Sequence, residues 1–75
     1  MLNGLHIETY GPRTIHKYYK DDELHRIGGP ATITYIDNVL DCEEYRVNGD
    51  LHRIGGPALI LYTSNATVVY YEAYY

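Results

Sequence analysis

The chain has 75 residues and a formal net charge of −4, with ten Tyr, no Phe, no Trp and a single cysteine, Cys42. This length fits one domain, residues 1–75, with little room for a core, and the lone thiol excludes an internal disulfide and favours a reducing, cytoplasmic location. The acidic balance argues against nucleic-acid binding through phosphate contacts, and no apolar run approaches the roughly 20 residues of a membrane span.

The first 21 residues are predicted to hold two strands. Residues 5–9 and 14–19 are rich in β-branched and aromatic side chains, and Gly11-Pro12 separates them. Two interpretations of residues 5–12 remain open. They form either a degenerate copy of the repeat that follows or an ordinary N-terminal strand with a Gly-Pro turn. Residues 20–23 are polar and predict another turn.

An internal repeat organises the rest of the chain. Residues 24–31 return unchanged as residues 51–58, an offset of 27, and ten of fourteen positions match when 22–35 is aligned with 49–62. A period of this size is typical of a supersecondary unit stacked on copies of itself. We therefore divide the chain into repeat 1 (22–48) and repeat 2 (49–75), preceded by a degenerate copy or cap (1–21).

Each repeat is predicted to contribute a β-hairpin. Residues 31–36 alternate with period two, Asp37-Asn38 supplies a turn, and residues 39–47 form the returning strand. A bulge near Glu43-Glu44 would bring the apolar residues of that strand to one side. Asn48-Gly49 is the strongest hairpin signal in the chain.

The two repeats differ on one predicted face. The inner face keeps the same residue types in both copies, namely Ala31, Ile33 and Tyr35 in the first and Ala58, Ile60 and Tyr62 in the second. On the outer face, Thr32 and Thr34 become Leu59 and Leu61.

The last predicted strand, residues 67–75, is apolar on both faces. An aromatic edge strand in water is prone to aggregate, so we expect a second copy of the chain, in a homodimer, or a foreign protein to cover it. The predicted partner surface consists of Leu59, Leu61, Tyr70, Tyr71, Tyr74 and Tyr75.

No segment places apolar residues at helical spacing for three turns. The predicted fold is all-β, with consecutive antiparallel β-hairpins from a 27-residue repeat forming a single twisted sheet. Connectors containing the Leu-His-Arg and Gly-Pro sequences join one hairpin to the next.

The connectors resemble a known family. The pattern Asn-Gly-x-Leu-His-Arg-x-x-Gly-Pro-Ala, with an aromatic residue before it, resembles the MORN-like repeat, in the Leu-His-Arg variant of phage, giant-virus and antitoxin-like proteins. The matching residues are Tyr45, Asn48, Gly49, Leu51, His52, Arg53, Gly56, Pro57 and Ala58, and in the first copy Tyr18, Leu24, His25, Arg26, Gly29, Pro30 and Ala31. The chain departs from the pattern at Asp21-Asp22, where the family has Asn-Gly, and has Tyr at the usual Trp position.

The resemblance implies β-hairpins laid side by side that act as a scaffold or a protein-binding surface. Short phage proteins of this size often inhibit host factors or immunity systems, anti-CRISPR proteins included, and would work in the host-cell cytoplasm. This implication comes from architecture and not from a site.

Paired His residues raise the possibility of a metal site. His25 and His52 with Asp22, Glu23 or Asp50 could bind zinc. The alternative, which we favour, is that each His hydrogen-bonds the connector backbone. We accordingly expect no cofactor.

Arg26 and Arg53 could clamp carboxylates or phosphates. The favoured alternative is a ladder of salt bridges across the sheet with nearby acids. Those acids are Glu23, Asp50, Glu43 and Glu44. Structural roles are thus predicted for His25, Arg26, Gly29, Pro30, His52, Arg53, Gly56 and Pro57.

Catalytic machinery is not evident. Ser64 is the only Ser and falls in a predicted turn, and the acids Asp41 and Glu43 would raise the pKa of Cys42 instead of activating it. We therefore expect a non-catalytic protein-binding module, a small inhibitor of a host or immunity protein. The alternatives are an assembly protein that polymerises through its repeat ends and a metal-dependent nucleic-acid enzyme using His25 and His52.

Overall fold

β-Strands, turns and loops make up the described part of the chain. The computed structural model describes residues 1–62 with their side chains and the backbone of residues 69–73. None of these residues forms a helix, so the described part has no helix that could cross a membrane. The strands are β1 (Gly4–Tyr10), β2 (Arg13–Lys20), β3 (Glu23–Leu24), β4 (Thr32–Ile36), β5 (Val39–Glu44), β6 (Arg46–Val47), β7 (Asp50–Leu51), β8 (Leu59–Tyr62) and β9 (Val69–Ala73).

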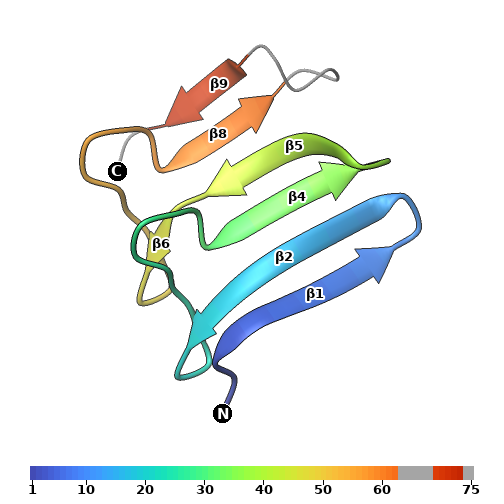
Figure 1. Cartoon of the computed structure of the whole chain (residues 1–75). Helices are drawn as coiled ribbons and strands as arrows, with labels where there is room; N and C mark the ends of the chain where they lie inside the picture. Colours follow the sequence, from blue (N-terminus) through green and yellow to red (C-terminus); the bar gives the residue numbers. More distant parts are fainter. Residues whose placement is uncertain (63–68, 74–75) are drawn as a thin grey trace.

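Three hairpins lie side by side in the main sheet. The strand order is β1-β2-β4-β5-β8-β9, and each neighbouring pair is antiparallel (Figure 1). This arrangement confirms the all-β prediction of three consecutive antiparallel hairpins. It leaves β1 and β9 at the two edges.

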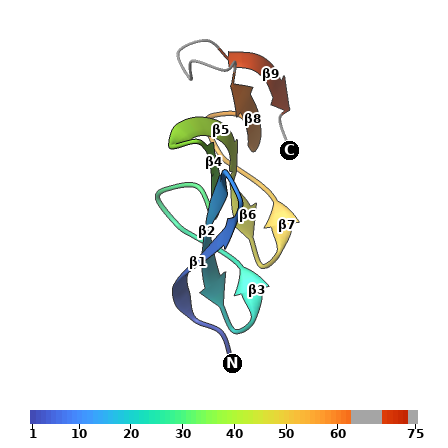
Figure 2. The same cartoon turned by 90° about the vertical axis from the view of Figure 1, so that its right-hand side faces the viewer.

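Two small hairpins stand apart from this row. β3 pairs with the end of β2, and β6 pairs with β7 in a separate two-stranded sheet. Figure 2 shows β3 and β7 on the same side of the main strands. The expectation of a single sheet is therefore wrong for β6 and β7. The ladder of the main sheet ends at Glu44, and the chain leaves that sheet at Tyr45, between β5 and β6.

Left-handed backbone at the predicted turns explains their residue types. Asp37 and Asn38 have φ of 51° and 64°, and Asn48 and Gly49 have φ of 50° and 86°. Asp, Asn and Gly tolerate this region best, and two such residues in succession give the tight turn that matches the twist of paired strands. At the N-terminus β1 is followed by a turn at Gly11-Pro12, an arrangement that both interpretations of residues 5–12 allow.

The bulge in β5 lies earlier than predicted. Tyr35 pairs with Leu40 and Thr34 pairs with Cys42, so Asp41 is the extra residue, not Glu43 or Glu44. The reason is that residues 42–44 pair with β4 on one side and with β8 on the other. A bulge at Asp41, beyond the end of β8 pairing, disturbs one ladder instead of two.

The sheet has a very small core. The main strands form one layer, and the molecule measures 34 × 31 × 15 Å (Figure 2). Among the described residues the buried hydrophobic side chains are Ala31, Ala58 and Ile60, and no large side chain is fully buried. Thr32, predicted to face outward, is 8% exposed and more buried than Ile33. Position within the sheet, rather than an inner face, decides burial here.

Candidate partner-binding site between the connector loops

Two loops with identical sequences, residues 25–31 and 52–58, lead from the small hairpins to the main strands; we call them the connector loops. In the first, the guanidinium carbon of Arg26 lies 4.0 Å from the centre of the Tyr18 ring, and its Nη1 donates to the Pro30 carbonyl at 3.2 Å. In the second, Arg53 lies 3.9 Å from the centre of the Tyr45 ring and donates to the Pro57 carbonyl at 3.2 Å. The arginines therefore fold back onto their own loops.

A glycine makes room for each guanidinium. A Cβ placed on Gly29 would lie 2.9 Å from Cζ of Arg26, and a Cβ on Gly56 would lie 2.8 Å from Cζ of Arg53. Real Cβ atoms essentially never approach a neighbour this closely. A side chain at Gly29 or Gly56 would thus displace the guanidinium at the end of the flexible Arg side chain, and glycine at these positions lets the arginine lie in contact with a tyrosine ring.

The predicted ladder of salt bridges is wrong for these arginines. The two ion pairs among the described residues join Lys17 to Glu8 and Arg46 to Glu44. Within the same residues, Arg26 and Arg53 have no carboxylate partner. Their guanidinium groups instead lie over the Tyr rings and donate to the Pro carbonyls.

The first connector loop is fastened to the second small hairpin. Nδ1 of His25 accepts a hydrogen bond from the Asn48 backbone N–H at 3.0 Å, and the Arg26 N–H donates to the Arg46 carbonyl at 3.2 Å. His25 therefore bonds the backbone of the neighbouring turn at Asn48, and not the connector backbone that the favoured interpretation names. His52 is exposed, and its backbone N–H donates to the Tyr45 carbonyl at 2.9 Å.

The described residues contain no group of three or more His, Cys, Asp or Glu side chains placed to hold a metal ion. The structure thus does not bring His25 and His52 together with Asp22, Glu23 or Asp50 as a zinc site.

A cleft of about 440 Å³ lies between the two connector loops. Its lining residues are Arg26, Ile27, Gly28, Gly29, Tyr45, Val47, His52, Arg53 and Ile54. Two arginines and a histidine are among them, and no acid is, although the chain as a whole has a net charge of −4. We call this feature the connector cleft.

Two isoleucines of the connector cleft are strongly exposed. Ile27 is 77% exposed and Ile54 is 89% exposed, at equivalent positions of the two loops. An exposed apolar pair beside guanidinium groups is suited to a protein partner with apolar and acidic side chains, because such a partner would cover the apolar surface and bring negative charges to the positive ones. Sequence reasoning missed this pair. Its signal was a hydrophobic residue placed directly before Gly-Gly in both copies.

The predicted C-terminal surface is described only in part. Leu59 and Leu61 are half-buried in β8 and pair with Ala73 and Tyr71 of β9. Tyr70 also belongs to β9. The side chains of β9, and residues Tyr74 and Tyr75 altogether, lie outside the described part of the chain.

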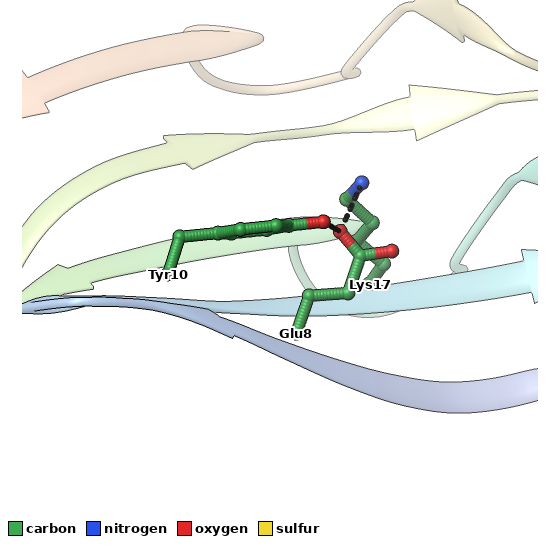
Figure 3. Close-up of polar contacts among 3 residues, drawn as sticks. All are labelled: Glu8, Tyr10 and Lys17. Carbon is green, nitrogen blue, oxygen red and sulfur yellow. Dashed lines mark hydrogen bonds and ion pairs between the residues drawn. The ribbon is translucent and has the colours of Figure 1, made fainter.

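A polar cluster on the N-terminal hairpin was also missed (Figure 3). Oε1 of Glu8 accepts hydrogen bonds from Lys17 Nζ at 2.9 Å and from the Tyr10 hydroxyl at 3.0 Å. The bond from Lys17 lowers the pKa of Glu8, and the bonds to Glu8 raise the pKa of Lys17 and of Tyr10. Exposed ion pairs contribute little to stability, so this cluster fixes side-chain positions on the outermost hairpin.

Cys42 is protonated at neutral pH. Burial raises the pKa of its thiol to about 11, and the negative charges of Glu44 and Asp41 add to the effect. The predicted direction is confirmed, with burial as the larger cause. A thiol in this state is a poor nucleophile.

Comparisons of the chain with protein-family models, with curated proteins and with solved structures found no match.

Proposed function

We propose that this chain is a non-catalytic protein-binding module, a small inhibitor of a host or immunity protein, of the phage anti-defence or antitoxin-like kind. The observation that supports this most directly is the connector cleft, where Ile27 and Ile54 stay exposed beside two arginines without carboxylate partners in the described residues. The resemblance of the connectors to the MORN-like repeat supports the same function.

The thinness of the sheet also supports a partner. Protein domains normally pack two or more layers around a core, whereas the main strands in the described part of this chain form one layer with few buried apolar side chains. Covering an exposed Ile contributes roughly 1.5–3 kcal/mol. A partner seated on the connector cleft would therefore gain affinity from both isoleucines, and its acidic groups would meet Arg26 and Arg53. The lone thiol of Cys42 supports a cytoplasmic setting for this complex.

The test begins with capture of the bound protein from the native host and its identification by mass spectrometry. Affinity for that protein is then measured by calorimetry with the double variant Ile27→Ser/Ile54→Ser. We expect affinity to fall about tenfold or more, since each isoleucine loses its apolar contact. The matched control is Ile7→Ser, an isoleucine that is 56% exposed on β1, away from the cleft. Equal affinity of the double variant and the unchanged chain would contradict the proposal.

The homodimer is tested separately at β8. The double variant Leu59→Thr/Leu61→Thr gives the second hairpin the residues of the first, Thr32 and Thr34. If the C-terminal hairpin mediates self-association or target binding, the variant should show a lower mass by light scattering or weaker capture of the target. Unchanged mass and unchanged capture would exclude the C-terminal hairpin as a binding surface.

A second candidate function is assembly into a polymer, and the strand order favours it. β1 and β9 occupy opposite edges, and the six strands alternate in direction. β9 of one copy would consequently run antiparallel to β1 of a copy placed beside it in the same orientation, and the sheet could continue. Concentration-dependent growth beyond a dimer in light scattering would favour this function over the inhibitor.

A further inference from the structure

The strand β1, at one edge of the main sheet, has the features of a strand that pairs with another chain (Figure 1). Proteins commonly protect a sheet edge with Pro, Lys, a bulge or a very short strand. Across Gly4–Tyr10, β1 has neither Pro nor Lys, and its seven residues pair with β2 without a register shift. The side chains of Leu5 and Ile7 are 46% and 56% exposed. β1 is therefore a long edge strand without these protective features.

The outer side of β1 faces away from the rest of the sheet. Among the described residues only β2 pairs with this strand. Residues 63–68 and 74–75 adjoin β8 and β9 in the sequence, the two strands farthest from β1. The outer side of β1 is thus the edge at which the sheet could be extended.

The hydrogen bonds of β2 show which residues of β1 turn their backbone groups outward. The N–H of Tyr18 donates to the Ala31 carbonyl at 2.8 Å, so it does not bond Leu5, the residue opposite it in β1. Opposite residues of an antiparallel ladder alternate between hydrogen-bonded and non-hydrogen-bonded pairs. The N–H and C=O groups of Leu5, Ile7 and Thr9 consequently point away from β2, to the outer side.

In one register this outer side is complementary to itself. Two copies of β1 that run antiparallel with Ile7 opposite Ile7 bring the outward backbone groups of Leu5 opposite those of Thr9. The same register places His6 of each copy opposite Glu8 of the other. Residues in such a non-hydrogen-bonded pair lie close, with Cα atoms about 4.5 Å apart. A histidine N–H opposite a carboxylate stabilises the pair there.

The neighbouring registers lack this agreement. A shift by two residues in one direction places Glu8 opposite Glu8, and like charges directly opposite each other are destabilising. A shift by two residues in the other direction places His6 opposite His6 and leaves Glu8 opposite Gly4, which has no side chain to donate. A shift by one residue sets outward backbone groups of one copy against inward-facing residues of the other. The side chains of β1 therefore select the register centred on Ile7.

We propose that β1 is a homodimer interface, in which it pairs antiparallel with β1 of a second copy about a twofold axis at Ile7. The contacts of Glu8 support this pairing (Figure 3). Lys17 and Tyr10 both donate to Oε1 of Glu8, so Oε2 accepts no hydrogen bond within the described residues. In the dimer, a ring N–H of His6 from the second copy donates to Oε2.

The twofold axis makes this contact closed, because each copy contributes the same edge. The dimer is distinct from the polymer, since a β1 that pairs with β1 has no edge left for β9. The connector cleft and β8 take no part in it, so the inference does not depend on the inhibitor function. Stable interfaces bury roughly 1,200–2,000 Å², and a contact limited to two edge strands is smaller. The dimer should accordingly dissociate on dilution.

Sedimentation equilibrium of the full chain over a wide concentration range tests the pairing and its register. We expect a monomer–dimer equilibrium. His6→Glu places acids opposite acids and should raise the dissociation constant about fivefold or more. The double variant His6→Glu/Glu8→His exchanges the two partners, keeps an acid opposite Lys17 and should restore the constant of the unchanged chain. Lys20→Gln, at an exposed position at the end of β2, makes the same change in net charge and is the matched control.

Amide hydrogen exchange locates the contact within β1. The N–H groups of Leu5, Ile7 and Thr9 should gain protection as the chain dimerises, whereas those of His6 and Glu8, which face β2, should not change. A chain that stays monomeric, or a dissociation constant that His6→Glu leaves unchanged, would overturn the proposal. Failure of the double variant to restore the constant would overturn the register and the proposal with it. Growth beyond a dimer would overturn it in favour of β9 of another copy.

The dimer and the inhibitor function fail separately. Ile7→Ser should weaken the dimer and leave the affinity for the captured protein unchanged, whereas Ile27→Ser/Ile54→Ser should do the opposite. A dimer that is unaffected by Ile7→Ser would overturn the pairing of β1 with β1. Protection of the Leu5 and Ile7 amides that appears only with the captured protein would also overturn it, since the occupant would then be a foreign strand.

Discussion

The guanidinium carbon of Arg53 lies 3.9 Å from the centre of the Tyr45 ring, and the same contact joins Arg26 to Tyr18 at 4.0 Å. Each contact holds a connector loop against a tyrosine from earlier in the chain, Tyr18 in β2 for the first loop and Tyr45 between β5 and β6 for the second. Because guanidinium groups are attracted to the faces of aromatic rings, the loop keeps its shape without a hydrophobic core beneath it. The arginine of each repeat consequently contributes to the stability of its connector loop.

Replacement of Arg53 by Met should destabilise the chain by about 1–2 kcal/mol, since the variant loses the contact with Tyr45 and the hydrogen bond to Pro57. Urea unfolding followed by circular dichroism measures the change. Tyr45→Phe keeps the aromatic ring and should destabilise the chain much less than Arg53→Met does. If Arg53→Met and the unchanged chain unfold at the same urea concentration, the contact does not stabilise the loop.

Replacement by Ala should have different effects at the adjacent glycines Gly55 and Gly56. At Gly56 a Cβ would meet Arg53, whereas at Gly55 it meets nothing within 4 Å but sits on backbone with φ of +88°. Gly56→Ala should therefore lower the free energy of unfolding by about 1 kcal/mol in the unchanged chain. The loss should be much smaller in the Arg53→Met background, because the guanidinium is then absent. Gly55→Ala should cost about 1 kcal/mol in both backgrounds, from backbone strain alone. Urea unfolding of the four variants forms the double-mutant cycles, and equal costs of Gly56→Ala in both backgrounds would contradict the packing argument.

Thr32→Val should stabilise the chain. Thr32 is 8% exposed, and its Oγ1 is buried without a hydrogen-bond partner among the described residues. Removing a buried, unpaired hydroxyl while keeping the side-chain shape should raise the free energy of unfolding by about 1 kcal/mol. Thr34→Val, at a half-buried position of the same strand, is the control and should have a smaller effect. A lower thermal midpoint for Thr32→Val would show that the hydroxyl is satisfied.

Stability should fall in alkaline solution. Burial raises the pKa of Cys42 from 9.0 to about 11, and burial together with a hydrogen bond to Glu43 raises the pKa of Tyr62 from 10.0 to about 12. The folded chain thus binds these protons more tightly than the unfolded chain does. Their contribution to stability is complete below pH 9 and is lost as pH rises from 9 to about 12.

Urea unfolding at a series of alkaline pH values tests this dependence. Cys42→Ala should remove the part of the slope that begins near pH 9, and Tyr62→Phe should remove the part that begins near pH 10. Identical slopes in both variants and the unchanged chain would contradict these pKa directions.

The hairpins could be predicted from the sequence because their signals are local. Asp37-Asn38 and Asn48-Gly49 set their own backbone conformation, and the alternating residues around them define strands whatever lies elsewhere. The separate β6–β7 sheet was harder to foresee, because residues 39–47 have no Gly or Pro to mark the break at Tyr45.

Features that depend on several strands at once could not be read from the pattern. The bulge falls at Asp41 because β8 pairs with the strand only from Cys42 onward. The burial of Thr32 likewise follows from its place between neighbouring strands. The inner and outer faces inferred from alternation presuppose a covering layer, which the described part of the chain lacks.

The connector cleft illustrates the same limit for the candidate site. The repeated residues identified the connector loops, but the long side chain of Arg26 could reach either an acid or the ring of Tyr18, and only the folded geometry decides. Likewise His25 and His52 are identical in sequence context, yet one bonds the neighbouring turn and the other is exposed.

The single-layer sheet also determines how the chain responds to heat and denaturant. Globular proteins gain roughly 12–15 cal/mol/K per residue in heat capacity on unfolding, mainly because apolar surface becomes hydrated. A chain whose described core is Ala31, Ala58 and Ile60 exposes little new apolar surface when it unfolds. Its heat-capacity increment and its urea dependence should both be small for its length. The free energy of unfolding should then vary little with temperature, and the thermal unfolding transition should be broad. When a partner covers the sheet, the curvature should increase and the transition should become narrower.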